Sequence, residues 1–383
     1  MDAWRGGLWI AAALLMAAGA VRARGPGAPP PAEAPPRKEA DWPGSTDGLV
    51  FLWHDASRPN RVPRAGGKAP FVCRVRARGR ARYYRFHDMD LAGGAFLAED
   101  VDARLLSACR RTNQLAVEAV LTPGNVKQTG PARIVTFSRG AASRNFTLAQ
   151  QGAELVFRLR TSSSGPDGTK AQPAPCRLEA GKPQHVIVTY ANGTTACYLN
   201  GRQVSTGRAV RGELGTWSAD QHLLFGDEWD GGRDWAGRLE GIAIYSRFIA
   251  PAEAKRKYAL YARRLAARRP ARRVVLLGRL VEVTPTPTLR SIRPYRRCLA
   301  VCTYEVREVL SGRYDDKKML VAHWVIMDRK VLDLKRRKGR TVRLTVEPFA
   351  DHPQLDAERT VMVQNEWGLQ RYYDVTGPPK ADR

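Results

Sequence analysis

Two Asn-Gly pairs in one short stretch constrain the fold of this chain more than any other feature. Asn192-Gly193 and Asn200-Gly201 are each flanked by alternating apolar residues. Asn-Gly is the strongest short-range signal for a β-hairpin, because both central positions of a type I′ turn need a positive φ angle. The two pairs therefore predict a three-stranded antiparallel meander over residues 185–207.

The first twenty residues indicate where the protein acts. Arg5 lies in a short basic region, residues 6–17 are apolar, and Ala18-Gly19-Ala20 has the A-x-A pattern of a cleavage site. The apolar run is shorter than the roughly 18 residues that span a membrane, which argues against the alternative of a membrane anchor. We therefore predict a signal peptide over residues 1–20 and a secreted, periplasmic or cell-surface protein with no membrane span after cleavage.

Composition divides the rest of the chain. Residues 21–44 are rich in Pro and Ala without an apolar period, which predicts an extended linker before a folded part that starts near Ser45. Residues 48–161 contain short strand patterns separated by Gly or Pro breaks, as in an all-β sandwich. Pro251 and Glu253 then begin a helical pattern with positive charge toward its end, which predicts a closing helix. The helix continues into a basic connector over residues 263–273, and Pro270 ends the helical pattern.

One order of motifs points to a family. A strand, the turn Tyr-Leu-Asn-Gly at 198–201, the Phe-Gly-Asp loop at 225–227 and the pattern G-x-L-x-G-x-A-I-Y at 237–245 follow one another. This order resembles the closing half of a laminin-G-like jelly roll, the concanavalin A-like lectin/glucanase fold. The resemblance covers roughly residues 49–260. It implies an antiparallel jelly-roll β-sandwich over residues 45–262 and a sugar-facing binding module.

A second, smaller β domain is predicted over residues 274–379. Five strand candidates occur there, namely VVLLGRLVEV, CLAVCTYEVREVL, KMLVAHWVIM, TVRLTVE and TVMVQNEW. Five short strands are typical of a small barrel of OB type. The segments at 278–283 and 304–312 resemble netrin-like domains, although the cysteine pattern of that family is missing. The predicted fold class is mainly β, a jelly-roll sandwich followed by a smaller β-barrel-like domain.

The six cysteines leave the disulfides open. Export makes disulfide bonds permissible but not required, since domains of this size can build cores unaided. Cys298 and Cys302 lie in one strand-like run, where four residues span about 13 Å, too far for the two to bridge one another. No spacing typical of zinc or thioredoxin sites occurs.

Catalytic motifs are absent from the sequence. Retaining glucanases of the jelly-roll fold place carboxylates at alternate positions, as E-x-D-x-E, with nucleophile and acid/base about 5.5 Å apart. The nearest match, Glu99 to Asp102, lacks the third carboxylate and fits a polar loop before an amphipathic stretch. We therefore expect a protein that is not an enzyme. A hydrolase or lyase of the same fold is the alternative.

The loop 227–235 carries the first group of candidate site residues. Asp227, Glu228 and Asp230 offer hard oxygens on a flexible loop, which favours calcium as a possible cofactor. Trp229, Arg233 and Trp235 offer flat aromatic faces and a planar polar group for a sugar. The alternative is a structural turn whose acids pair with Arg233 and whose Trp235 belongs to the core.

Positive charge supplies the second group. The formal net charge is +26, and arginines alternate from Arg74 to Arg82, with Arg76, Arg78 and Arg80 as candidate ligand-binding residues. Gly79 suggests a turn that divides the arginines between two neighbouring strands. Together with the connector and the basic run 335–338, they favour binding of a polyanion. The leading hypothesis is an exported, non-catalytic carbohydrate- or matrix-binding protein for anionic polysaccharide or cell-surface glycan. A protein-binding scaffold is a third possibility, and the export signal argues against nucleic acid.

Overall fold

The computed structural model describes residues 42–376 with several gaps. The gaps are 55–59, 65–67, 84–87, 170–171, 209, 269–271, 328, 333, 335, 353–354, 357 and 364–367. The predicted signal peptide, the predicted linker up to residue 41, Pro270 and Lys335 lie outside the described residues.

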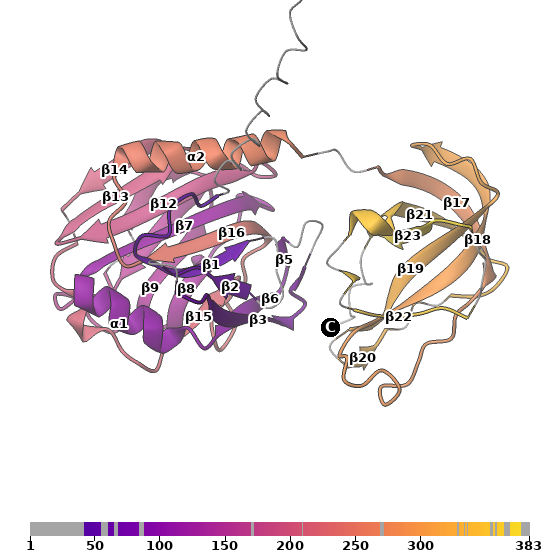
Figure 1. Ribbon diagram of the computed structural model, residues 1–383, viewed down its shortest axis with the longest axis horizontal. Coiled ribbons are helices and arrows are strands. Elements are labelled where there is room, and N and C mark those ends of the chain that lie inside the picture. The colour runs from indigo at the N-terminus through magenta and orange to yellow at the C-terminus, as the bar shows by residue number, and fades with distance from the viewer. Residues whose placement is uncertain are drawn as a thin grey trace, which may run out of the picture. The chain divides into compact units, whose positions relative to one another are not determined.

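Two eight-stranded antiparallel sheets build the first part of the structure (Figure 1). The first sheet has the order β14 (Arg202–Gly207), β13 (Thr194–Leu199), β12 (Gln184–Ala191), β7 (Gln114–Pro123), β16 (Gly237–Tyr245), β5 (Met89–Leu91) and β4 (Arg82–Tyr83), with β1 (Leu49–His54) paired to β16. The second sheet has the order β11 (Gln172–Arg177), β10 (Glu154–Leu159), β9 (Ser143–Gln151), β8 (Ala132–Gly140), β15 (His222–Phe225), β6 (Gly94–Glu99), β3 (Phe71–Gly79) and β2 (Asn60–Val62). A single apolar core runs from Trp42 to Tyr261. The predicted β-sandwich is confirmed.

The predicted meander is confirmed in detail. Strands β12, β13 and β14 pair consecutively and antiparallel. The φ angles of Asn192 and Gly193 are 46° and 85°, and those of Asn200 and Gly201 are 50° and 75°. All four values are positive, as type I′ turns require.

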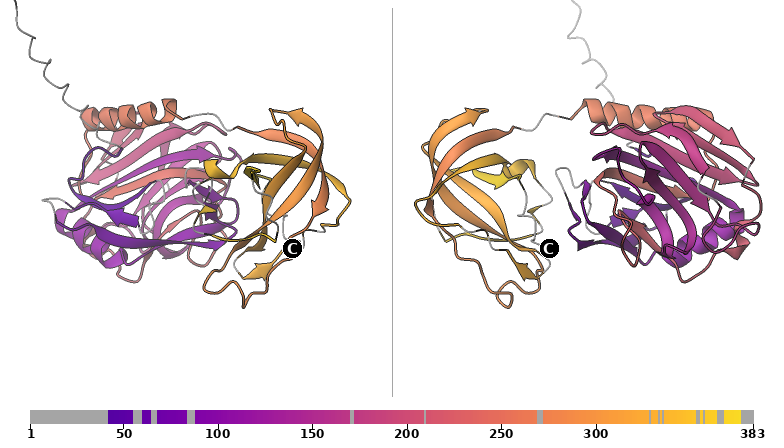
Figure 2. Two further views of the ribbon diagram at one scale, coloured as in Figure 1. Left: turned by 45° about the vertical axis from the view of Figure 1, so that its right-hand side comes forward. Right: turned by 180° about the vertical axis from the view of Figure 1, so that it is seen from behind.

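Two α-helices accompany the sandwich. Helix α1 (Asp102–Thr112) buries Leu105 and Cys109. Helix α2 (Pro251–Ala266) begins with Pro251, has Glu253 in its first turn and arginines in its last, so the predicted closing helix is confirmed. It runs along the first sheet next to β12 and β14 (Figures 1 and 2). In the described part of the chain, no helix has the length and apolar character needed to cross a membrane.

A buried charge cluster joins the start of the sandwich to α2. The carboxylate of Glu118, on β7, accepts hydrogen bonds from Trp42 Nε1 at 2.6 Å and Tyr245 OH at 2.9 Å, and lies 2.8 Å from His185 Nε2. Its second oxygen lies 3.1 Å from Lys257 Nζ on α2. Burial raises the pKa of Glu118, but the hydrogen bond to His185 and the charge of Lys257 outweigh burial and hold the pKa below its ordinary value. Because Trp42 is only 3% exposed, the packed sandwich starts before the expected Ser45.

The C-terminal strands close a five-stranded ring (Figure 2). The ring has the order β17 (Val274–Glu282), β18 (Cys298–Ser311), β19 (Lys318–Met327), β23 (Arg371–Asp374) and β21 (Thr341–Pro348), which pairs back to β17. Four of the five predicted barrel strands are therefore in the ring. The predicted barrel-like architecture is confirmed. The fifth predicted strand does not join the ring: residues 360–361 of TVMVQNEW belong to β22 (Arg359–Val361), which pairs with β18 outside the ring, and residues 364–367 lie outside the described residues.

The barrel contains a buried histidine and carboxylate pair. His323 Nδ1 on β19 lies 2.9 Å from Asp374 Oδ2 on β23, and His323 Nε2 lies 3.1 Å from Tyr304 OH. Burial lowers the pKa of His323 more than Asp374 raises it. For Asp374, burial raises the pKa, but the hydrogen bond to His323 and the other favourable contacts bring it below its ordinary value.

Candidate functional site

The side chain of Trp229 forms the most exposed aromatic surface on the loop after β15. Trp229 is 36% exposed. The guanidinium carbon of Arg78 lies 4.7 Å from the centroid of the indole ring, and the ring of His222 stacks on the indole with centroids 4.1 Å apart. The structure thus brings together Trp229 and Arg78, which the sequence placed in two separate candidate groups.

His222 is fixed in place by the first turn of α1. Its Nδ1 lies 3.1 Å from Asp102 Oδ2, and the other oxygen of Asp102 accepts a hydrogen bond from the backbone N–H of Leu223 at 3.1 Å. Burial raises the pKa of Asp102, although the bond to His222 opposes this. The sequence offered no signal for the His222 contact, since it depends on the loop 226–235 folding back over its own strand.

Exposed arginines extend the surface along β3. Arg74, Arg76 and Arg78 are exposed at alternate positions of this strand, so they share one face. Arg76 pairs with Glu99 at 3.1 Å. In the part of the chain that the structure describes, Arg74 and Arg78 have no carboxylate partner. This arginine row, with Trp229 and His222, is called the Trp229 surface below.

The turn predicted at Gly79 is present, but its consequence differs from the prediction. Gly79 has a φ of 62° and ends β3, and Arg80 lies in the turn, where its Nε donates to the carbonyl of Ala92 at 3.2 Å. Arg82 follows on β4 and pairs with Asp90 at 2.9 Å. Because β3 and β4 belong to different sheets, the two strands are not neighbours, and Arg80 is not part of the row on β3.

The loop 226–235 covers the middle of the outer face of the second sheet. Phe96 and Phe225 belong to the core, so Leu97 and Leu224, their neighbours on the strands, face outward. Strand registers give the row across this outer face as Arg76, Leu97, Leu224, Thr136, Thr147 and Arg158. Leu224 and Thr136 are nevertheless fully buried. At the β3 end of this row Arg76 is exposed, and the Trp229 surface lies there.

The acidic residues of the loop hold the loop itself. One oxygen of Asp227 accepts hydrogen bonds from the backbone N–H groups of Glu228 and Arg233, at 2.8 and 2.7 Å. Glu228 is buried, and its two oxygens lie 2.5 Å from Arg133 Nε and 2.5 Å from Ser138 Oγ. Asp230 is exposed. No group of three or more His, Cys, Asp or Glu suited to a metal occurs in the described ranges. Calcium binding stays a prediction, which calorimetric titration of the protein with Ca²⁺ would test.

Two other predicted ligand-binding residues make their contacts within the protein. Trp235 is fully buried, and its Nε1 donates to Gln150 Oε1 at 2.7 Å. Its indole has no free face, so the alternative interpretation as a core tryptophan is correct. The guanidinium of Arg233 donates to the carbonyl of Gly130, and its backbone N–H donates to Asp227, so Arg233 closes the loop.

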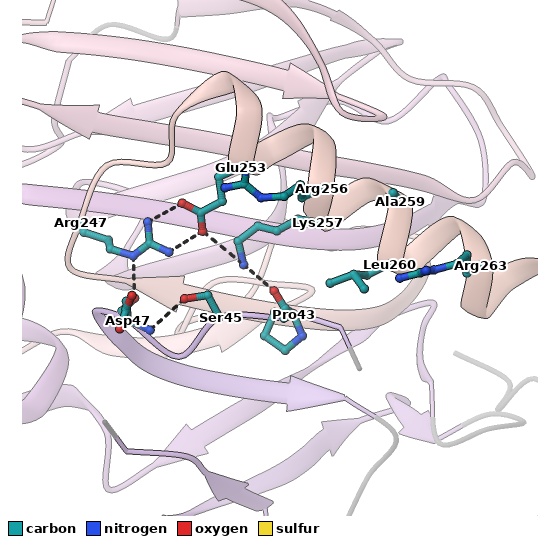
Figure 3. A pocket seen from close by; sticks show the side chains of 11 residues that line it. Pro43, Ser45, Asp47, Arg247, Glu253, Arg256, Lys257, Ala259, Leu260 and Arg263 are labelled. Carbon is teal, nitrogen blue, oxygen red and sulfur yellow. Dashed lines mark hydrogen bonds and ion pairs between the residues drawn. The ribbon is translucent and has the colours of Figure 1, made fainter. Parts of the chain in front are cut away.

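A concave region lies beside α2 (Figure 3). It has a volume of about 580 Å³ and is lined by residues 43–47 and by side chains from α2 and the residue Arg247. Arg247 pairs with Glu253 and donates from Nε to the carbonyl of Asp47 at 2.6 Å, and Lys257 Nζ donates to the carbonyl of Pro43 at 2.8 Å. These ion pairs and hydrogen bonds connect residues 43–47 with Arg247 and α2. We call this region the clasp.

The family comparison agrees with this fold. Residues 99–255 match the family model described as the concanavalin A-like lectin/glucanases superfamily, which confirms the predicted resemblance over that part of the chain. A search of curated proteins found no match to the sequence.

Solved structures give distant likenesses. Domain 4 of a GH43 extracellular arabinanase from Geobacillus stearothermophilus, in complex with arabinotriose, has a TM-score of 0.41 at 14% identity over 55% of this chain and 98% of that chain. The binding domain of botulinum neurotoxin serotype D/C has a TM-score of 0.42 at 11% identity, over 79% of this chain and 74% of that chain. The CBM40 domain of the Ruminococcus gnavus IT-sialidase, bound to α2,3-sialyllactose, has a TM-score of 0.37 at 13% identity, over 44% of this chain and 95% of that chain. Because the TM-scores are below 0.5, these structures are too distant to indicate a function.

Proposed function

We propose that this protein is an exported, non-catalytic glycan-binding protein whose ligand is an anionic polysaccharide or cell-surface polymer. The observation that carries the proposal is the Trp229 surface, where an exposed indole lies 4.7 Å from the guanidinium of Arg78. The match of residues 99–255 to the concanavalin A-like lectin/glucanases superfamily supports the choice of a glycan.

The chemistry of the surface suits a charged sugar. The part of the Trp229 indole that His222 and Arg78 leave exposed can pack against the apolar face of a pyranose ring, while guanidinium groups bind carboxylate or sulfate substituents through paired hydrogen bonds. Arg74 and Arg78 are exposed on the same face of β3, four residues and therefore about 13 Å apart, with Arg76 between them. A polymer with negative groups about 13 Å apart could contact both arginines while one of its rings packs against the exposed part of Trp229.

The carboxylates near the surface favour binding over hydrolysis. Glu99 pairs with Arg76, and both oxygens of Asp102 accept hydrogen bonds from the start of β15. A retaining glycosidase needs two carboxyl groups about 5.5 Å apart that both face the scissile bond. Neither Glu99 nor Asp102 is free to take such a role without losing these partners.

The first experiment compares ligands. The mature protein is applied to a glycan array that carries neutral, uronic and sulfated glycans, at low and at high salt. We expect binding to the uronic and sulfated glycans that weakens as salt rises, because ionic contacts are screened. Binding confined to neutral glycans and unchanged by salt would contradict the anionic ligand and leave a lectin for neutral sugars.

A pair of matched double variants then tests the site. Arg74→Ser/Arg78→Ser removes two exposed arginines of the Trp229 surface, and Arg202→Ser/Arg208→Ser removes two exposed arginines on or next to β14, in the other sheet. Both variants lose the same formal charge. We expect only the first to weaken binding strongly and to lower the slope of log affinity against log salt by about one per lost contact. Equal losses in both variants would indicate attraction by net charge alone.

Enzymatic activity is tested separately. Incubation of the wild type with each bound polysaccharide should release no reducing ends or unsaturated products. Product release that disappears in Asp102→Asn or Glu99→Gln would replace the proposed binding function by a hydrolase or lyase of this fold.

A further inference from the structure

All six cysteines are free and buried in the structure. Cys109 lies on α1, and Cys298 and Cys302 lie on one strand, β18. The spacing along β18 keeps the latter two about 13 Å apart, in agreement with the sequence-based expectation. Cys176 and Cys197 differ, because they lie on two strands that contact one another, β11 and β13, and their side chains interact.

The two thiols come from different sheets. Cys176 lies on β11, the end strand of the second sheet, and Cys197 lies on β13, next to the end strand of the first sheet. Strands β11 and β13 contact one another where the two sheets end. Cys176 is 1% exposed and Cys197 is 2% exposed, so the pair is enclosed between the sheets. Among the described strands, β11 and β13 belong to different sheets and do not pair, so a covalent bond there would connect the two sheets at this edge.

We propose that Cys176 and Cys197 form a disulfide bond when the chain folds in an oxidising compartment. The oxidant is a disulfide of low molecular mass, such as oxidised glutathione. One cysteine thiolate attacks it and releases one glutathione thiol, which leaves a mixed disulfide. The second cysteine then displaces the other glutathione. Two protein thiols are oxidised, one glutathione disulfide is reduced, and the two protons pass to the two released thiols.

The buried location determines when the bond can form. The interaction with Cys176 and burial both raise the pKa of the Cys197 thiol, so the attacking thiolate is scarce once the sandwich is packed. Exchange is therefore fast only while the edge between β11 and β13 is open, during folding. Once formed, the same burial protects the bond from thiols in solution.

Peptide mapping of the wild-type chain tests the proposal directly. The full chain is refolded either with oxidised and reduced glutathione or with a phosphine reductant, and free thiols are then blocked before tryptic digestion. Cleavage after Lys170, Arg177 and Arg202 places the two cysteines in different peptides, 171–177 and 178–202, because Lys182 precedes a proline. We expect these two peptides joined in the oxidised sample only. Six blocked thiols in the oxidised sample, or a bond that joins other cysteines, would overturn the proposal.

Thermal unfolding supplies a second measurement. The bond would close a loop of about 22 residues, which should raise the melting temperature of the oxidised protein on the order of 5–10 °C above that of the reduced protein. Cys176→Ser and Cys197→Ala should each abolish this difference, whereas Cys109→Ser should keep it. The same difference in all variants would contradict the assignment. If a variant fails to fold, the peptide map of the wild type still decides. None of these outcomes depends on the proposed glycan binding.

Discussion

Replacing Lys257 by methionine should destabilise the sandwich more than any single change on its surface. The ammonium group of Lys257 lies 3.1 Å from Glu118 Oε2, 2.7 Å from Tyr245 OH and 2.8 Å from the carbonyl of Pro43, and its side chain is 2% exposed. Methionine keeps most of the aliphatic stem but removes the charge. Glu118 would then be a fully buried carboxylate without its ammonium partner.

The size of the effect follows from that burial. Removing one partner of a buried ion pair costs about 3–5 kcal/mol, because the remaining charge stays desolvated. Glu118 keeps hydrogen bonds from Trp42 and Tyr245 and its contact with His185, which favours the lower half of that range. We therefore expect the free energy of unfolding to fall by about 3–4 kcal/mol.

Urea denaturation, followed by tryptophan fluorescence, measures this loss. The matched control is Lys255→Met, two residues earlier on the exposed side of α2, which should change the free energy of unfolding by less than about 0.5 kcal/mol. Combining Lys257→Met with Glu118→Gln should recover part of the loss, since no buried charge is then left unpaired. A loss below about 1 kcal/mol in Lys257→Met would refute the reasoning, because the ammonium would then contribute no more than an exposed ion pair.

Three further outcomes are expected. Trp229→Ala should remove most glycan binding. Because the residue is 36% exposed, the melting temperature should stay within about 2 °C of the wild type. A large loss of stability would count against a binding role. Trp235→Phe should instead lower the free energy of unfolding by about 1–3 kcal/mol, because Gln150 Oε1 loses one of its two buried donors and the smaller ring leaves a cavity, and should leave the affinity of the folded protein unchanged. In the barrel, the folded-state pKa values of His323 and Asp374 are both lowered. The stability they contribute is thus complete above about pH 6.5, the unfolded value of histidine, and is lost as the pH falls through the folded values. The hydrogen-exchange protection factors of the peptides from β18 and β19, which are corrected for the pH dependence of intrinsic amide exchange, should therefore fall on acidification, less so in His323→Gln.

Local sequence signals predicted the turns and the strands that depend on them. The Asn-Gly pairs have the positive φ angles that a type I′ turn needs, and Pro251 begins α2. Each of these features depends on a few adjacent residues, so the local sequence is sufficient to predict it.

Contacts between distant segments were not predictable in the same way. Nothing near Trp42 shows that its indole binds Glu118, 76 residues later, which is why the expected start of the folded part came too late. The ring-closing strand β23 has four residues and no distinct alternation, whereas TVMVQNEW has a stronger strand pattern but pairs outside the ring. In both cases the deciding interactions are tertiary contacts, which the secondary-structure propensity of the local sequence does not predict.

The candidate site shows the same division. The sequence identified Trp229 and Arg78 separately by residue type, but not that they touch, nor that His222 stacks on the same indole. It also left two interpretations of Trp235 open, because an indole in a glycine-rich loop has the same local pattern whether it packs inward or outward. Only the hydrogen bond to Gln150 distinguishes them.

The clasp has a mechanical consequence (Figure 3). The chain enters the sandwich at residues 42–47 and leaves it through α2, and the contact of Lys257 with Pro43 holds entrance and exit side by side. A tensile force applied through the flanking segments, as when a polymer is held at one end and a cell surface at the other, would act first on this contact and on the pairing of Arg247 with Glu253. The two sheets would carry little of the load until the clasp opened, so the Trp229 surface would keep its shape under moderate pulling.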